Sequence, residues 1–178
     1  GGVRIDYGVG GLHSAVQGHH QSTEDEVIMS YDVASMYPNI AIANNVCPEH
    51  LGRSFCKSYE DFYNERKKFA KGTSENLAIK LGLNATYGNS NNKYSPFYDP
   101  KYTMSITVNG QLTLSMKIEK VVEKFDAKLL MGNTDGAEFL INRKYISDVE
   151  KLIHKWEKYV GLQMEGVFYD HMYIRDVN

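Results

Sequence analysis

A tight-turn motif between two apolar runs constrains this fold more than any other feature. The motif NTDG, residues 133–136, separates two β-favouring runs at residues 127–132 and 137–142. Asn, Asp and Gly are the residues that a short turn between antiparallel strands prefers. The motif therefore predicts a β-hairpin with Asp135 at its bend. Two interpretations of Asp135 stay open at this point, because it is either a reactive carboxylate or an ordinary turn residue.

The other segments predict a mixture of strands and helices. Two long segments, 106–125 and 147–160, place apolar residues on one face at helical spacing. The segments expected as helices are 35–43, 59–70, 75–86, 106–125 and 147–160, and those expected as further strands are 27–33, 163–169 and 172–177. Residues 1–26 are rich in Gly, His and Ser and predict an irregular N-terminal segment. The expected fold class is α+β, an antiparallel sheet with helices packed on one face and a short helical hairpin.

Composition sets broad limits on function. The chain has 178 residues, of which 42% are hydrophobic, enough for one domain with a sizeable core. Its 20 basic and 22 acidic residues give no basic footprint for a nucleic-acid partner, although basic surfaces can lie in segments outside this chain. Cys47 and Cys56 lack metal-ligand spacing, and no apolar run approaches a membrane span. We therefore expect a cytoplasmic protein without a membrane partner, and the start without Met suggests a piece of a longer polypeptide.

Two aspartates stand out as a candidate metal site. Asp32 lies near the end of the predicted strand 27–33, and Asp135 lies in the hairpin turn. If these strands are neighbours, both carboxylates face one edge of the sheet. Close carboxylates repel each other, so both remain ionised most readily beside a cation such as Mg²⁺, which prefers oxygen ligands. This arrangement is the minimum for two-metal phosphoryl or nucleotidyl transfer.

A third stretch, KLGLNATYG at residues 80–88, suggests a partner for such a site. Lys80, Asn84 and Tyr87 fall at i, i+4 and i+7 and share one helical face. A cation, an amide and an aromatic ring on one face can hold a triphosphate and pack on a base. Arg66, on the preceding predicted helix, could add charge. The alternatives are a solvated Lys80 and a half-buried core Tyr87.

Together these stretches resemble the signature motifs of family B DNA polymerases. YDVASMYPNI resembles motif A, written DxxSLYP; KLGLNATYG is similar to motif B, KxxxNxxYG; and GNTDG resembles motif C, DTDS. The three occur in the family's order. The N-terminal YGVGGLHS is also similar to the Tyr-Gly-Gly segment that links exonuclease and polymerase domains in phage members. The chain thus resembles the palm domain of a bacteriophage-type family B polymerase.

The resemblance implies a role for each matching residue. Asp32 and Asp135 match the catalytic carboxylates that bind two Mg²⁺ ions, with Mn²⁺ as an alternative, and the Val33 carbonyl matches a further metal ligand. Tyr37 matches the steric gate beneath the deoxyribose. The implied contacts to the incoming nucleotide come from Arg66, Lys80, Asn84 and Tyr87.

The implied protein is a template-directed DNA polymerase acting in phage DNA replication in the host-cell cytoplasm. Its implied partners are primer–template DNA, deoxynucleoside triphosphates, and exonuclease and thumb regions of the same polypeptide; the primer could be DNA, RNA or protein. The expected organisation is a linker at 1–26, palm at 27–58 and 89–178, and short fingers at 59–88, with no thumb.

Two departures from motif C keep other functions open. Asn133 stands where the family has its first Asp, and Gly136 stands where it has Ser. Asn133 lowers the negative charge beside the metals, so a non-catalytic palm that serves as a nucleic-acid-binding or assembly module is an alternative. A cyclase-like palm acting on a single nucleotide is a further alternative, against which the KxxxNxxYG helix argues.

Overall fold

The computed structural model describes residues 3–176 of the chain. These residues form two compact units, and the boundaries between them fall after Ala34 and after Asn109. The sheet unit comprises the residues up to Ala34 together with those from Gly110 onward, and the helical unit comprises Ser35–Asn109. Each unit is described separately below.

The sheet unit contains a six-stranded antiparallel sheet in the order β1-β2-β5-β6-β4-β7. Its strands are β1 (Asp6–Tyr7), β2 (Leu12–Ala15), β4 (Glu26–Val33), β5 (Lys128–Asn133), β6 (Gly136–Asn142) and β7 (Met164–Tyr169). Two more strands, β3 (Gly18–Gln21) and β8 (His171–Ile174), pair in a second, two-stranded sheet. The predicted α+β class with an antiparallel sheet is confirmed.

Strand β4 is an interior strand of the six-stranded sheet. It pairs with β6 on one side and β7 on the other, and its residues from Val27 to Tyr31 are all buried. A strand covered on both faces reads as a continuous apolar run, which explains the segment VIMSY in the sequence. Asp32 breaks this run and is exposed, while the following Val33 is buried again.

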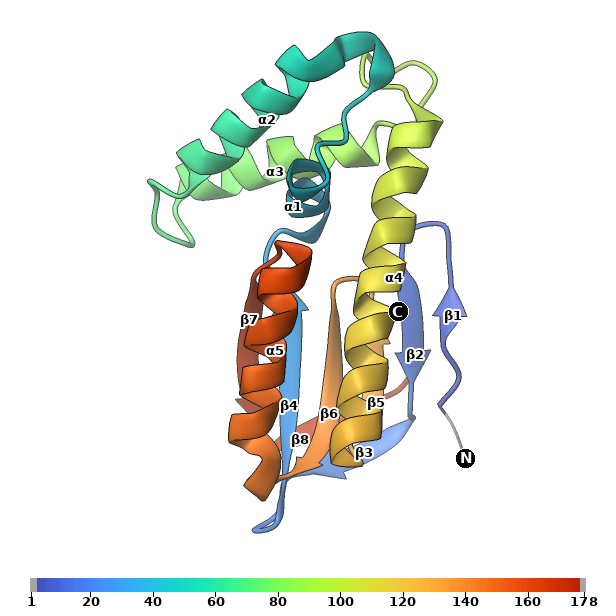
Figure 1. Cartoon of the computed structure of the whole chain (residues 1–178), viewed down its shortest axis with the longest axis vertical. Helices are drawn as coiled ribbons and strands as arrows, with labels where there is room; N and C mark the ends of the chain where they lie inside the picture. The colour runs from blue at the N-terminus through green and yellow to red at the C-terminus, as the bar shows by residue number, and fades with distance from the viewer. Residues whose placement is uncertain (1–2, 177–178) are drawn as a thin grey trace. The chain divides into compact units, whose positions relative to one another are not determined.

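Two helices cover one face of the sheet, as Figure 1 shows. They are the part of α4 (Pro100–Phe125) from Gly110 onward, and α5 (Ile146–Val160), which follows the 3₁₀ helix η2 (Arg143–Tyr145). Their buried side chains include Leu114, Ile118, Val121 and Phe125 from α4 and Val149, Ile153 and Trp156 from α5. This is the apolar stripe that the helical spacing predicted.

The N-terminal prediction was wrong. Residues 1–26 were expected to be irregular, but they include β1, β2 and β3. The reason is that these strands acquire their order from distant partners: β2 pairs with β5, and β3 pairs with β8. At the other end, the strand expected at 172–177 ends at Ile174, and residue 177 lies outside the described residues.

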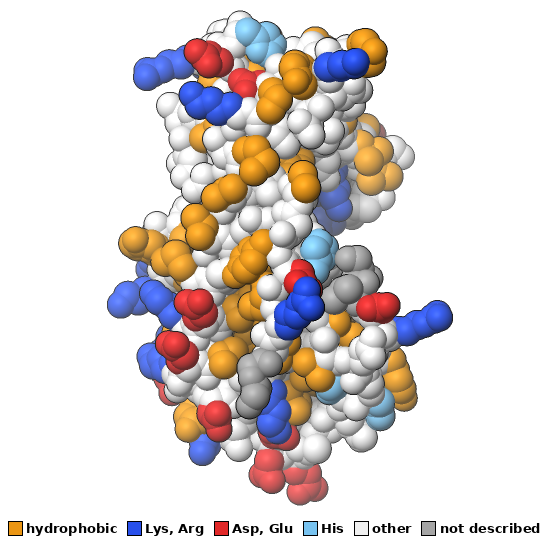
Figure 2. All heavy atoms as spheres, turned by 90° about the vertical axis from the view of Figure 1, so that its right-hand side faces the viewer, with side chains coloured by type: hydrophobic (Ala, Val, Ile, Leu, Met, Phe, Trp, Pro, Cys, Tyr) orange, Lys and Arg blue, Asp and Glu red, His pale blue; other side chains and the backbone are white. Residues whose placement is uncertain are grey.

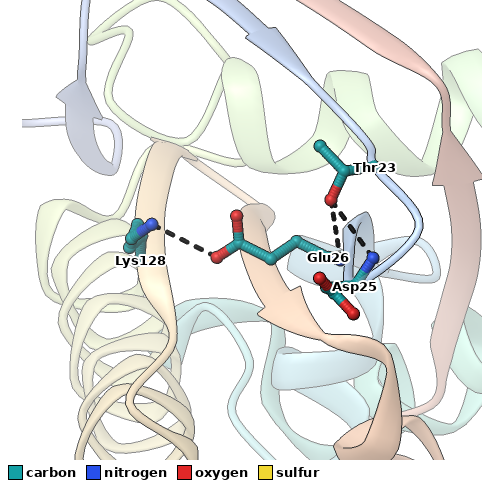
Figure 3. A network of polar contacts seen from close by, with 4 residues as sticks. All are labelled: Thr23, Asp25, Glu26 and Lys128. Carbon is teal, nitrogen blue, oxygen red and sulfur yellow. Dashed lines mark hydrogen bonds and ion pairs between the residues drawn. The ribbon is translucent and has the colours of Figure 1, made fainter.

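The turn before β4 and the first residue of this strand are held by polar contacts, drawn in Figure 3. The Thr23 hydroxyl accepts hydrogen bonds from the backbone N–H of Asp25, at 3.3 Å, and of Glu26, at 3.0 Å. The Glu26 carboxylate forms an ion pair of 3.2 Å with Lys128 of β5. These contacts hold the end of β4 opposite to Asp32.

The helical unit contains α1 (Met36–Ala43), the 3₁₀ helix η1 (Glu49–Leu51), α2 (Gly52–Arg66) and α3 (Ser74–Gly88). Helices α2 and α3 form the predicted hairpin, although α2 begins and ends earlier than expected. The buried Tyr59 hydroxyl donates to the Leu83 carbonyl at 2.7 Å and ties the two helices together. The Thr73 side chain caps α3 by accepting from the Asn76 N–H at 3.3 Å.

The face of the molecule drawn in Figure 2 does not favour one sign of charge. On the face shown in Figure 2, acidic and basic side chains are interspersed among hydrophobic ones. This mixture agrees with a formal net charge of −2. Among the residues from 3 to 176, no helix is both long enough and apolar enough to cross a bilayer.

Candidate active site

The sheet unit brings Asp32 and Asp135 together at the ends of neighbouring strands. Asp32 of β4 pairs with Gly136 of β6, the residue that directly follows Asp135. The Val33 N–H donates a 2.7 Å hydrogen bond to the Asp135 carbonyl oxygen. The two aspartates therefore flank one backbone contact, as expected if β4 and the hairpin are neighbours.

The turn that carries Asp135 is a two-residue hairpin loop. Asn133 and Gly136 pair across its base, which leaves Thr134 and Asp135 in the loop. Thr134 has a φ of 23°, and its N–H donates to the Leu12 carbonyl at 2.9 Å. A Cβ on Gly11 would lie only 2.9 Å from the Thr134 hydroxyl oxygen, so the loop packs closely against the β1–β2 connection. These contacts hold Asp135 on an ordered bend.

Gly136 explains one departure from motif C. A Cβ built on Gly136 would collide with Oδ1 of Asp32, and it would lie 3.1 Å from the Tyr31 carbonyl oxygen. The Asp32 carboxylate thus occupies the space above Gly136. A residue with a side chain at this position would require Asp32 to move.

The environment of Asp32 disfavours its ionised form. Desolvation by the surrounding protein raises the pKa of Asp32 above its usual value, and the Asp135 charge raises it further. The Lys117 charge acts in the opposite direction, and Glu165, which pairs with Asp32 from β7, adds a smaller increase. A bound cation would relieve this repulsion.

The residues at this edge of the sheet fit a magnesium site in which the substrate supplies some of the metal ligands. Among the described residues, no group of three His, Cys, Asp or Glu could hold a metal ion by itself. Mg²⁺ commonly takes only one or two protein carboxylates and fills its other positions with phosphate oxygens and water. Asp32 and Asp135 supply that number, and Val33 directly follows Asp32 in the chain.

Lys117 is the charged residue near this edge that sequence analysis missed. Its side chain is 0% exposed, and its Nζ donates to the Tyr31 carbonyl at 3.0 Å. Burial lowers the pKa of Lys117 to about 7, against the opposing charges of Asp32, Glu138 and Asp135. One signal was present in the sequence, because position 117 follows the buried Leu114 by three residues and so shares the apolar face of α4.

Glu138 is a second charged residue that interacts with Lys117, and it is partly buried. Burial raises the pKa of Glu138, and Ser30, its partner across β4 and β6, donates to its Oε1 at 3.1 Å. Its Oε2 is buried and has no hydrogen-bond partner within the part of the chain that the structure describes. Lys117 and Glu138 interact electrostatically with each other and with Asp32.

The helical unit groups part of the predicted nucleotide-binding set. The rings of Tyr37 and Tyr87 stack with centroids 3.9 Å apart and planes 15° apart. The Tyr87 hydroxyl shares a 2.7 Å hydrogen bond with Thr107. Two tyrosines far apart in the sequence thus form one aromatic platform within this unit.

The remaining predicted residues lie on α2 and α3. Arg66 is half-buried; its guanidinium donates to the Ser35 hydroxyl at 2.5 Å and to Asn76 Oδ1 at 3.2 Å. Ser35 lies two positions before the stacked Tyr37, so Arg66 reaches the start of α1. Lys80 is exposed and Asn84 is half-buried on the helix that carries Tyr87.

Comparisons with known proteins find one class of relatives. No known family model matches the sequence. The DNA polymerase of Thermococcus sp. (strain 9oN-7) is 27% identical over 83% of this chain, and that of Thermococcus gorgonarius is 25% identical over 80%. These relatives are archaeal DNA polymerases. The chain spans about a quarter of their length, 24% and 23% respectively.

A solved structure shares this fold. The family B DNA polymerase from the hyperthermophilic archaeon Pyrobaculum calidifontis matches 92% of this chain with a TM-score of 0.62 and 16% sequence identity. The match covers 26% of that polymerase, so this chain has the fold of one part of it. The archaeal relatives give no support to the bacteriophage type that the sequence motifs suggested.

Proposed function

We propose that this chain is the palm, with short fingers, of a template-directed DNA polymerase. The observation that carries the proposal is the adjacency of Asp32 and Asp135, whose strands are joined by the 2.7 Å hydrogen bond from the Val33 N–H to the Asp135 carbonyl. The likeness to archaeal DNA polymerases over most of the chain supports it. The reaction is attack of the primer 3′-oxygen on the α-phosphate of a deoxynucleoside triphosphate, with pyrophosphate as the leaving group.

The chain's own residues would prepare this reaction at the edge of the sheet. Asp32, Asp135 and the Val33 carbonyl would hold two Mg²⁺ ions, or Mn²⁺ in their place. When bound, the ions supply activation of the primer hydroxyl and neutralisation of charge on the phosphates. The hydrogen bond at the base of the site fixes the separation of the two aspartate backbones, and this order reduces the reorganisation needed during reaction.

The helical unit would supply the nucleotide contacts. Tyr37 would close the space beside the sugar 2′ position, and its stacking on Tyr87 would hold its ring in place. Lys80 and Arg66 would bind the triphosphate, and Asn84 would orient it from the same helix as Lys80. Positioning of this kind supplies a large share of phosphoryl-transfer catalysis.

The proposed partners follow from the reaction. They are primer–template DNA, deoxynucleoside triphosphates, and exonuclease and thumb regions of a longer polypeptide, in keeping with relatives that extend well beyond this match. The proposed organisation is a palm at 27–58 and 89–178 and fingers at 59–88, of which residues 177 and 178 lie outside the described residues. We place the activity in the cytoplasm, where replication substrates are found, and leave the primer as DNA, RNA or protein.

A second candidate function is a palm that binds nucleic acid without catalysis. Asn133 pairs with Gly136 at the base of the turn and contributes no charge there, and the charge of the buried Lys117 acts on both aspartates. Both features reduce the net negative charge around Asp32 and Asp135. Such a palm would keep its fold and its DNA contacts but would not extend a primer.

Primer extension by the intact polypeptide separates the two functions. The wild type should extend a primer with Mg²⁺ or Mn²⁺, and Asp32→Ala and Asp135→Ala should each lower the rate by more than about a hundredfold. Asp126→Ala, an exposed aspartate elsewhere in the sheet unit, is the matched control and should keep wild-type activity. A wild type that retains DNA but extends nothing would favour the non-catalytic palm.

A further inference from the structure

We propose that Lys117 is a positioning residue whose buried ammonium group lies behind the Asp32–Asp135 pair and thereby lowers the affinity of this pair for free divalent cations. This proposal rests on the metal role proposed above for the two aspartates. Its consequence is that the ions enter the site together with the nucleotide triphosphate and do not occupy it beforehand.

The position of Lys117 follows from strand alternation. Side chains of successive residues point to opposite faces of a strand, so Tyr31 and Asp32 face opposite sides of β4. The Tyr31 ring lies over Gly166 of β7, where a Cβ would come within 2.7 Å of it. Burial raises the pKa of Tyr31 to about 12, and the charges of Glu150 and Glu157 of α5 contribute to this rise, as expected for a ring on the side of the sheet that the helices cover.

Lys117 extends from α4 on that same helix-covered side. Its Nζ lies 6.0 Å from the Trp156 ring of α5 and donates to the Tyr31 carbonyl at 3.0 Å. This carbonyl belongs to the peptide that leads directly into Asp32. The ammonium therefore meets the strand from behind the carboxylate, and solvent does not screen it because the side chain is fully buried.

A buried ammonium persists only where negative charges compensate it. The groups that do so here are, in order of effect, Asp32, Glu138 and Asp135. Glu138 is itself held by the Ser30 hydroxyl at 3.1 Å. Two of the three compensating charges are thus the proposed metal ligands, so Lys117 and a bound cation compete for the same carboxylates.

Asn133 acts in the same direction as Lys117. It provides an uncharged amide at the base of the turn that carries Asp135. This edge of the sheet has one carboxylate fewer than motif C of the family, and it carries the additional charge of Lys117. It therefore attracts an isolated divalent ion weakly. A triphosphate carries the negative charge that restores the balance, which is why we expect metal and nucleotide to bind together.

The test measures metal binding in the intact chain without DNA or nucleotide. Free Mn²⁺ is followed by its electron paramagnetic resonance signal in the wild type, Lys117→Met and Lys117→Gln. Both substitutions remove the charge, and the glutamine retains a hydrogen-bond donor for the Tyr31 carbonyl. Both should bind Mn²⁺ about tenfold more tightly than the wild type.

Lys120→Met is the matched control, because Lys120 is an exposed lysine on the same helix. It removes the same charge in a screened position and should change the affinity by less than about twofold. Unchanged or weaker Mn²⁺ binding in both Lys117 variants would overturn the proposal. Equal tightening by Lys120→Met would also overturn it, since the effect would then arise from net charge.

Two further measurements locate the effect. Adding Asp32→Asn to Lys117→Met should abolish the tighter binding, and its persistence would place the ion elsewhere and overturn the proposal. Thermal unfolding should show that both Lys117 variants remain folded, because each replaces a charge that is costly to bury with an apolar or neutral side chain. Loss of folding in both would assign Lys117 to stability alone. Absence of Mn²⁺ binding in every variant would instead reject the metal site of the proposed function.

Discussion

The carboxylate of Asp32 fills the space that a side chain at Gly136 would need. The two residues pair across β4 and β6, and the loop residue Asp135 directly precedes this glycine. The absence of a side chain at position 136 is therefore coupled to the position of a carboxylate that we assign to the metals.

Gly136→Ala should displace the Asp32 carboxylate. We expect Mn²⁺-dependent primer extension to fall by more than about tenfold, and the free energy of unfolding to fall by about 1–3 kcal/mol because of local overpacking. Gly10→Ala is the control, since a Cβ there meets nothing within 4 Å. Extension rates and chemical denaturation measure the two effects. Wild-type extension by Gly136→Ala would show that the position of Asp32 is not critical.

Tyr37→Ala should weaken discrimination against ribonucleotides. The ring of Tyr37 is held by stacking on Tyr87 at 3.9 Å, so its removal opens the space we assign to the sugar 2′ position. We expect relative incorporation of ribonucleotides to rise by about tenfold or more, measured as the ratio of kcat/KM for the two sugars. Tyr94→Ala, at an 84% exposed tyrosine of the same unit, should leave this ratio unchanged. Unaltered sugar selectivity in Tyr37→Ala would remove the gate role.

Asn133→Asp should strengthen metal binding. The new carboxylate would stand at the base of the turn that carries Asp135, where it adds attraction for a divalent ion. We expect the Mg²⁺ concentration for half-maximal extension to fall by about threefold to tenfold. Asn142→Asp adds the same charge at the opposite end of β6 and should have no such effect. A higher Mg²⁺ requirement in Asn133→Asp would contradict the charge argument.

Lys117 should make stability depend on pH. Its pKa is lowered to about 7 in the folded chain, while an unfolded lysine keeps its proton to about pH 10.5. Between these values the unfolded state binds more protons, so the free energy of unfolding should rise as pH increases from about 7 toward 10, by on the order of 1–3 kcal/mol. The groups that face this amine are Asp32, Glu138 and Asp135. Chemical denaturation across this range should show the rise in the wild type and a flat profile in Lys117→Met; a rise of equal size in both would exclude Lys117 as its source.

Local sequence patterns were sufficient for the centre of the fold. The turn chemistry of NTDG predicted the β5–β6 hairpin, and the apolar run before Asp32 predicted β4. The spacing of apolar residues predicted α4 and α5, although α4 begins at Pro100, six residues before the predicted start at 106. In these segments the local preference and the tertiary environment agree, because each element buries the face that its own pattern makes apolar.

Features that depend on distant partners were missed. Strands β2 and β3 have no strong local signal and exist because β5 and β8 pair with them. From the sequence alone, Lys117 is expected to be an exposed lysine on a helix. Its burial follows only from the packing of α4 against β4 and α5. Glu138 occupies one of the partly exposed positions that alternate along β6. Its partial burial depends on tertiary packing, which the strand's own pattern does not predict.

The central claim is that Asp32, Asp135 and the Val33 carbonyl hold the catalytic ions. The most direct measurement is the anomalous scattering of Mn²⁺ in crystals of the intact polypeptide with primer–template DNA and an incoming nucleotide. We predict anomalous peaks within roughly 2–2.5 Å of carboxylate oxygens of both aspartates. A nucleotide-bound crystal with Mn²⁺ peaks only at other residues, or with none at this edge of the sheet, would contradict the account.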